Sequence, residues 1–113
     1  MDEESLFIDE LKRAVIDDNL SAYIDMIKRT KAEDIKNDHW RFFVEIIQAR
    51  GDAAVDAIET VFRQVMVDTL ANTLGILDGS SILKTMRGVF IVSYNGKALP
   101  QTLADTFLES EEQ

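Results

Sequence analysis

The residues that could support chemistry in this sequence are few, and the single histidine, His39, is the first to consider. An imidazole titrates near neutral pH and can act as a general base or a metal ligand. His39 follows Asp38, as in part of a catalytic triad, but neighbouring helix positions point about 100° apart. The sequence also offers no activated nucleophile for such a triad. We therefore predict no catalytic residue and expect His39 at a helix surface or cap.

Acidic side chains form the second group. Asp52, Asp56 and Glu59 have the i, i+4, i+7 spacing of one helical face, where the helix dipole favours negative charge. Glu59 can also pair with Arg63 four residues later. A cation site would need oxygen ligands converging from a loop or from several helices, and the sequence has no EF-hand or paired Glu-x-x-His motif. We predict no metal site and interpret the stripe as a contact surface for a basic protein partner, together with Tyr94.

Polar residues within a long apolar pattern form the third group. Thr69, Asn72 and Thr73 are predicted near the buried seam of a helix, where they could line a small ligand pocket or make polar packing contacts. The five glycines are scattered, so there is no phosphate-binding loop or nucleotide fingerprint. The chain has no cysteine, which excludes disulfides and thiolate chemistry. No cofactor is predicted.

The first half of the chain has the apolar spacing of three helices. A helix is predicted from Ser5 to Asp17, and the cluster Asp17–Asn19 is expected to end it and cap a second helix. A charged loop over 28–37 follows, and Asp38 is expected to cap a third helix that Gly51 ends with a left-handed cap. The predicted buried faces are Phe7, Leu11, Ala14 and Val15; Leu20, Tyr23, Ile24 and Ile27; and Trp40, Phe43, Val44 and Ile47. Phe42 and Ile46 widen the third face, so that helix is expected to pack on more than one side.

One long helix is predicted from Asp52 to Asp78, ended by Gly79. It would measure about 40 Å if unbroken, so we expect a kink or break at Asn72 or Gly75. Its predicted seam is Val55, Ile58, Phe62, Val65, Met66, Thr69, Leu70, Thr73 and Leu77.

In the C-terminal part the helical spacing of apolar residues gives way to a strand-like pattern. Ser80 and Ser81 are expected to cap a short helix or turn that Gly88 closes. Residues 89–94 are rich in β-branched and aromatic side chains, and Asn95-Gly96 predicts a two-residue hairpin turn in which Tyr94 faces Lys97 and Val92 faces Leu99. In that register Phe90, Val92, Tyr94 and Leu99 share the side that packs on the helices. A final helix is predicted around Leu103, Phe107 and Leu108, with a frayed tail over 109–113.

These elements predict one domain over 1–113, mostly α, with four to six helices in a bundle-like domain and one C-terminal β-hairpin. A two-stranded hairpin is marginal alone, so it should lie on the helical body or pair with a second copy. Homodimerisation through the hairpin edge is therefore one expectation.

Net charge and hydropathy restrict the partners. With 21 acidic and 12 basic residues the net charge is −9, which disfavours nucleic acid and anionic lipid. The densest apolar runs are about four residues long, against roughly 18 or more for a membrane span. The acidic start of the chain and the absence of cysteine favour a cytoplasmic protein.

Two segments carry a family resemblance. The run 68–79, Asp-Thr-Leu-Ala-Asn-Thr-Leu-Gly-Ile-Leu-Asp-Gly, and the run 90–97, Phe-Ile-Val-Ser-Tyr-Asn-Gly-Lys, resemble small bacterial proteins in which a helix ends in Leu-Asp-Gly before a short strand or hairpin. Some of these look like immunity proteins of bacterial toxin systems, although they often carry a histidine where this chain has Asp68. The resemblance implies a non-enzymatic inhibitor and no catalytic residue.

The sequence therefore predicts a non-enzymatic protein-binding module, and the resemblance specifies it as an immunity-type inhibitor of a basic toxin or partner. Tyr23, Phe42 and Tyr94, if exposed, are candidate anchors for that partner. The alternatives are a small-ligand or regulatory domain with Thr69, Asn72, Thr73 and Tyr94 around its pocket, and a structural homodimer subunit. An enzyme is the class that the residues favour least.

Overall fold

The computed structural model describes residues 2–112. The chain begins with one continuous helix, formed by α1 (Glu3–Leu11), a π-helical segment η1 (Lys12–Asp17) and α2 (Asp18–Arg29). Asp17 and Asp18 have right-handed helical angles, so the predicted break at Asp17–Asn19 is wrong. These polar side chains find partners along the helix surface: Asp18 pairs with Arg13 at 3.1 Å, and Asn19 donates to the Val15 carbonyl at 2.8 Å.

The π-helical segment decides which side chains of this helix reach the core. A π turn holds more residues than an α turn, so it rotates the apolar stripe. Ile8 and Ile16 are both fully buried, although on an α-helix they would point roughly 80° apart. Ala14 is exposed, contrary to the α-helical spacing, whereas the other three predicted positions are half-buried. The prediction for Ala14 fails because it assumed uniform α-helical geometry.

After a 3₁₀ turn, η2 (Ala32–Asp34), helix α3 spans Asp38–Arg50. Its N-cap is Asn37, whose side chain accepts the Trp40 N–H at 2.9 Å. Asp38 was predicted to cap this helix, but it is the first helical residue and pairs with Arg41. Gly51 has the expected positive φ of 84°, yet its ψ of −167° is extended, because the chain turns there directly into the next helix.

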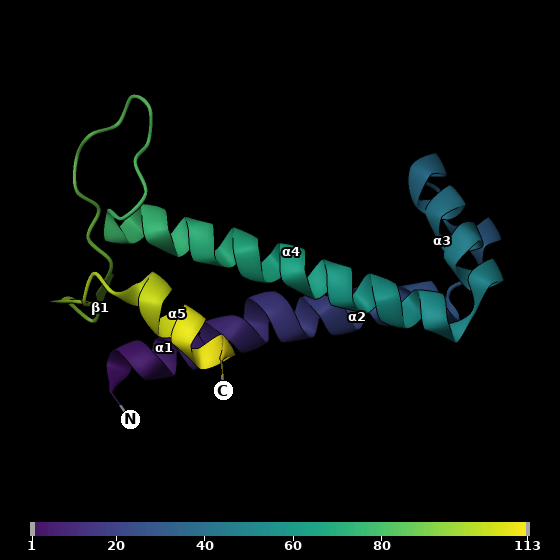
Figure 1. Ribbon diagram of the computed structural model, residues 1–113, viewed down its shortest axis with the longest axis horizontal. Coiled ribbons are helices and arrows are strands. Elements are labelled where there is room, and N and C mark those ends of the chain that lie inside the picture. The colour runs from purple at the N-terminus through teal and green to yellow at the C-terminus, as the bar shows by residue number, and fades with distance from the viewer. Residues whose placement is uncertain (1, 113) are drawn as a thin grey trace.

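Helix α3 packs on one side only. Trp40, Phe43, Val44 and Ile47 face the body as predicted. Phe42 is 65% exposed and Ile46 is 41% exposed, so the expected second packing side is wrong. Figure 1 shows the reason, since α3 stands at one end of the molecule with neighbours along one flank.

Helix α4 (Asp52–Asp78) runs unbroken for 27 residues and is straight in Figure 1, so the expected kink or break at Asn72 or Gly75 is wrong. Gly75 instead contributes to the C-terminal cap of the helix. Its carbonyl accepts the N–H groups of Ser80 and Ser81 at 2.9 and 3.1 Å, and a Cβ added there would lie 3.0 Å from the Ser81 hydroxyl. Gly79 ends α4 in the predicted left-handed conformation. Because α4 is unbroken, the molecule is elongated, measuring 49 × 36 × 25 Å.

The segment 79–92 forms a long loop with turns and bends, so of the two alternatives predicted from Ser80 to Gly88, a short helix or a turn, the helix is wrong. The Ser80 hydroxyl bonds back to the Gly75 carbonyl instead of starting a new helix. The hairpin that follows is confirmed, with β1 (Ser93–Tyr94) paired to β2 (Lys97–Ala98) and Tyr94 opposite Lys97. Asn95 and Gly96 both have positive φ, as a type I′ turn requires.

The hairpin strands are shorter than the sequence predicts. The Leu99 N–H still donates to the Val92 carbonyl at 2.7 Å, in the expected register. Pro100 follows with no N–H to donate, so the ladder stops there. Val92 and Leu99 pack on the helices, whereas Tyr94, predicted on the same packed side, is 59% exposed, so its predicted burial is wrong.

Helix α5 (Leu103–Glu111) is the predicted final helix. Its N-terminus is capped from a distance by Asp78, whose carboxylate accepts the N–H groups of Leu103 and Ala104 at 3.1 and 2.7 Å. Asp78, the last residue of α4, therefore also caps the start of α5. The predicted fraying from Glu109 is wrong up to Glu111, which ion pairs hold in place; Gln113 lies outside the described residues.

We expect Asp78→Ala to lower the free energy of unfolding by about 1–2 kcal/mol, because it leaves two N–H groups of α5 without a partner. Urea unfolding followed by circular dichroism measures this change. Asp105→Ala removes an exposed acid from the same helix turn and should change stability by less than about 0.5 kcal/mol. Equal effects of the two substitutions would contradict the capping role.

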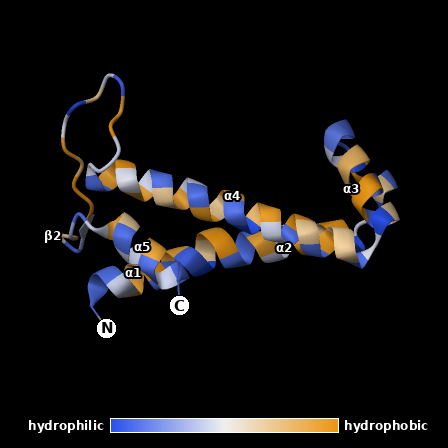
Figure 2. Ribbon diagram, viewed as in Figure 1, coloured by the Kyte–Doolittle hydropathy of each residue, from blue (hydrophilic) through white to orange (hydrophobic). Residues whose placement is uncertain are grey.

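Two apolar clusters stabilise the fold, one at each end of α4, and Met66 contacts both. In Figure 2 the hydrophobic residues of the packed helices are coloured orange. The first joins α1, η1, α4 and α5 through Ile8, Ile16, Leu70, Leu74, Leu99, Leu103, Ala104 and Phe107. The second joins α2, α3 and α4 through Leu20, Ile24, Ile27, Val44, Ile47 and Val55.

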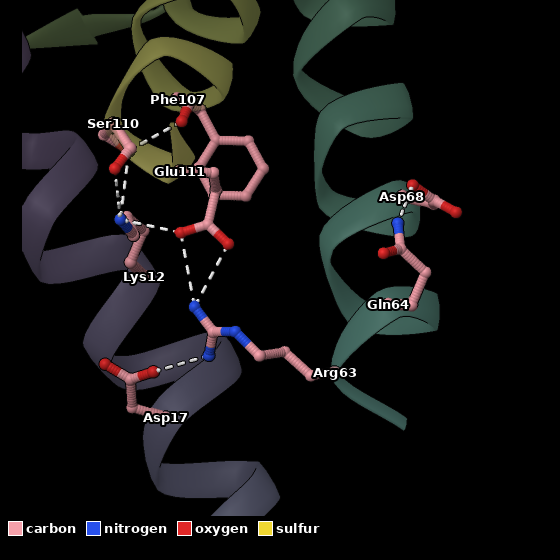
Figure 3. A network of polar contacts seen from close by, with 8 residues as sticks. All are labelled: Lys12, Asp17, Arg63, Gln64, Asp68, Phe107, Ser110 and Glu111. Atoms are coloured by element: carbon pink, nitrogen blue, oxygen red, sulfur yellow. Dashed lines mark hydrogen bonds and ion pairs between the residues drawn. The ribbon is translucent and has the colours of Figure 1, made fainter. Parts of the chain in front are cut away.

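A polar network ties the first cluster together at its rim (Figure 3). Arg63 of α4 reaches Asp17 and Glu111, each at 3.1 Å, and Lys12 reaches Glu111 at 2.8 Å. Arg63 was predicted to pair with Glu59, and that prediction is wrong. The two acceptors from η1 and α5 lie on the side of α4 to which Arg63 points, and together they engage both arms of its guanidinium.

Candidate functional site

The predicted acidic stripe is present but does not form a purely acidic surface. Asp52, Asp56 and Glu59 are all exposed on the first turns of α4. Asp52 and Asp56 line an open hollow with three basic residues at and just beyond the C-terminal end of α2, which are Lys28, Arg29 and Lys31. Opposite charges at this spacing weaken the field that would attract a basic partner. Tyr94 lies in the hairpin near the opposite end of α4, so the structure does not bring it together with the stripe.

The predicted ligand pocket is not assembled. Thr69, Asn72 and Thr73 are exposed, and the Thr73 hydroxyl donates to the Thr69 carbonyl at 2.8 Å. The seam lies on the other side of α4, where Leu70 and Leu74 pack against α5 and Leu99. Since α5 covers that side, these three polar residues face solvent.

Tyr94 borders a different hollow, of about 280 Å³, between the hairpin and α1. Its other lining residues come from α1 and the strand segment: Glu3, Leu6, Phe7, Glu10, Val92, Ser93 and Leu99. This volume is slightly below the roughly 300–1,000 Å³ typical of ligand sites.

His39 is exposed in the first turn of α3, which agrees with a surface position. Among residues 2–112, no group of three or more histidine, aspartate or glutamate side chains has the arrangement of a metal site. Within the same residues, no helix combines the length and apolarity needed to cross a membrane.

Aromatic side chains from three helices converge where α3 leaves the body. Tyr23 of α2 stacks on Trp40 of α3, with ring centroids 5.7 Å apart. Phe62 of α4 stacks on Phe43 at 6.0 Å and meets Tyr23 edge-on at 6.1 Å. The four rings fill the wedge between α3 and the other two helices. Such aromatic pairs contribute about 0.5–1.5 kcal/mol each beyond the area they bury.

This wedge leaves an apolar depression at the surface, which we call the aromatic groove. It consists of two adjoining hollows of about 320 and 330 Å³ that share Trp40 and Phe62. Val61 and Val65 lie beside the rings and are 55% and 58% exposed. The full lining is Tyr23, His39, Trp40, Phe43, Val61, Phe62, Val65 and Met66.

The exposed face of α4 extends the groove along the molecule. Val61, Val65, Asp68 and Asn72 have i, i+4, i+7, i+11 spacing and so share one helical face. In Figure 1 both α3 and the 79–92 loop project from the same side of α4, one at each end. The molecule therefore presents a long surface that is apolar near α3 and polar toward its middle.

The sequence named part of this site. Tyr23, Phe42 and Tyr94 were named as anchors on the condition that they are exposed, and all three are. The apolar pattern had placed Tyr23 on the buried face of its helix, which is wrong. Val65 was placed in the buried seam, which is wrong because its side chain is 58% exposed. Val61 was missed because it lies outside the predicted seam. Its i, i+4 spacing from Val65 could have indicated a second apolar stripe on α4.

Comparisons with family models, curated proteins and solved structures found no match to this chain.

Proposed function

We propose that this chain is a non-enzymatic protein-binding module and that the aromatic groove is its recognition site. The observation that carries the proposal is the pair of half-exposed valines beside Trp40 and Phe62. Clustered apolar surface of this kind, with tryptophan and tyrosine at its centre, is typical of protein interfaces. A partner side chain seated between Trp40 and Val65 would remove both from water.

The charge of the chain indicates the chemistry of the partner. The net charge is −9, and Asp68 lies on the same face of α4 as Val61 and Val65. A segment with apolar side chains flanked by lysine or arginine complements both features. Electrostatic attraction would chiefly raise the association rate, so binding should weaken as ionic strength increases.

An immunity-type inhibitor of a basic toxin is the more specific form of this proposal. Its support is the resemblance of segments 68–79 and 90–97 to such proteins, together with the acidic charge. The proposal includes a cytoplasmic location, as the composition suggests.

Affinity capture with two matched variants tests this function. Val61→Asp/Val65→Asp places charge in the groove, whereas Ala53→Asp/Thr60→Asp adds the same charge at exposed positions elsewhere on α4. From a lysate of the source cells, the wild type and the control variant should retain the same basic protein, and the groove variant should lose at least about 90% of it. Equal recovery with both variants would contradict the proposal.

Direct titration confirms that the captured protein occupies the groove. Trp40 is the single tryptophan and lines both hollows, so its emission reports on their occupancy. Adding the captured protein should shift this emission to shorter wavelength, and the shift should shrink at high salt. Unchanged emission on saturating addition would place the contact elsewhere.

A further inference from the structure

The 79–92 segment, which we call the basic loop, is chemically unlike the rest of the chain. Residues 79–104 contain Lys84, Arg87 and Lys97 and no aspartate or glutamate, so all 21 acidic residues lie outside them. Within the described residues, none of these three cations makes an ion pair. A positively charged loop therefore projects from an acidic body.

The basic loop also exposes apolar side chains with no intramolecular cover. Ile82 is 84% exposed, Val89 78%, Ile91 69% and Met86 59%. Figure 2 shows these orange stretches in the loop, which rises clear of the helices. Large apolar groups concentrated in one extended segment indicate a contact surface. The loop thus combines apolar and basic side chains, as does the partner segment proposed for the aromatic groove.

Within one molecule the two surfaces are kept apart. Val65 and Asp78 are thirteen residues apart on α4, which separates the groove from the base of the loop by about 20 Å. Both project from the same side of this straight helix, at its opposite ends. When two copies of such a helix lie antiparallel about a two-fold axis, each end meets the opposite end of its neighbour. The loop of each copy then lies over the groove of the other.

We propose that two copies of this chain associate in this reciprocal way, with the basic loop of each seated on the aromatic groove of the other. The inference rests on the groove of the proposed function. In a two-fold dimer the same contact forms twice. The basic loops and the aromatic grooves of both copies are therefore all covered. Asp68, beside Val65 on the exposed face of α4, is then placed to meet Lys84 or Arg87 of the second copy.

Pairing through the hairpin edge is less favourable than this arrangement. Two copies of the strand segment 89–94 aligned antiparallel would bring Arg87 and Lys97 of one copy toward the same cations of the other. Like charges facing one another destabilise an interface. Loop-on-groove pairing instead sets basic residues against the acidic body. It also means that a partner protein must displace the second copy before it can enter the groove.

Charge reversal tests the reciprocal dimer with exposed substitutions that leave the core intact. One variant is Asp68→Lys and the other is Lys84→Glu/Arg87→Glu. Each alone sets like charges at both contacts, so the dimer dissociation constant should rise at least about tenfold, as measured by sedimentation over a dilution series. Mixed in equal amounts, the two variants offer attraction at both contacts and should recover a dimer. Circular dichroism checks that both stay helical.

Three results would overturn the dimer: a wild type that is monomeric from low to high micromolar concentration, an Asp68→Lys variant that dimerises like the wild type, or a mixture that stays monomeric. Recovery of the dimer only on mixing would support it, because a hairpin-edge dimer would not depend on Asp68. The outcome is separable from the proposed function. A monomeric chain that still captures a partner through Val61 and Val65 would refute the dimer and retain the binding site.

Discussion

Replacing Phe107 with alanine is expected to lower the free energy of unfolding by about 3–5 kcal/mol. Phe107 is fully buried in the first apolar cluster, where α5 packs on α4. Removing the ring takes away its transfer free energy and leaves a cavity that the surrounding helices fill only in part. Domains of this size are stable by about 5–15 kcal/mol, so the loss is a large share of the total.

Urea unfolding measures the effect of Phe107→Ala, and the adjacent residue supplies a matched control. Leu108 is 43% exposed on the same helix, so Leu108→Ala should cost less than about 1 kcal/mol. The two variants change helix propensity in the same direction. A loss for Phe107→Ala as small as that for Leu108→Ala would mean that α5 does not pack on α4 as described.

The second large effect is expected at the other end of the molecule. Ile27 is fully buried in the second cluster, between α2, α3 and the start of α4. Ile27→Ala should lower the free energy of unfolding by about 2–5 kcal/mol. Ile46, also an isoleucine but 41% exposed on the outer side of α3, is the control, and Ile46→Ala should cost less than about 1 kcal/mol.

Both core variants should unfold in a single transition. Helix α4 runs through both clusters and Met66 contacts each, so loss of one cluster removes the support of the other. Trp40 emission reports on the second cluster, whereas circular dichroism reports on every helix. The two probes should give the same midpoint for Phe107→Ala, although the substitution is remote from Trp40. Separate midpoints would show that the two ends unfold independently.

The sequence predicted the elements whose local signals are strong. The spacing of Leu20, Ile24 and Ile27 placed the buried face of α2, because a regular α-helix repeats every 3.6 residues. Gly79 ended α4, and Asn95-Gly96 formed the hairpin, because both sites need positive φ, which glycine and asparagine adopt at little cost. The predicted fold class, mostly helical with one C-terminal hairpin, is confirmed for the same reason.

Elsewhere, hydrogen-bond and ion-pair partners overrode the helix-ending and helix-starting signals. Asp17 and Asp18 are typical helix-ending residues, yet ion pairs with Arg63 and Arg13 let the helix continue. Ser80 and Ser81 could start a new helix, but Gly75 takes up their N–H groups as the end of α4. Arg63 lies on another helix, 46 residues from Asp17, so this partner cannot be identified from the local pattern.

The candidate site shows the same division between sequence and structure. The sequence by itself determined the acidic charge and most of the helices, because composition and periodicity are local properties. Its periodicity placed Tyr23 on a buried face, whereas Tyr23 is 40% exposed. Only the tertiary structure decided that Tyr23, Trp40 and Phe62 meet, since they come from three different helices. It also turned Thr69 and Asn72 to solvent, because α5 packs on the opposite side of α4 through Phe107.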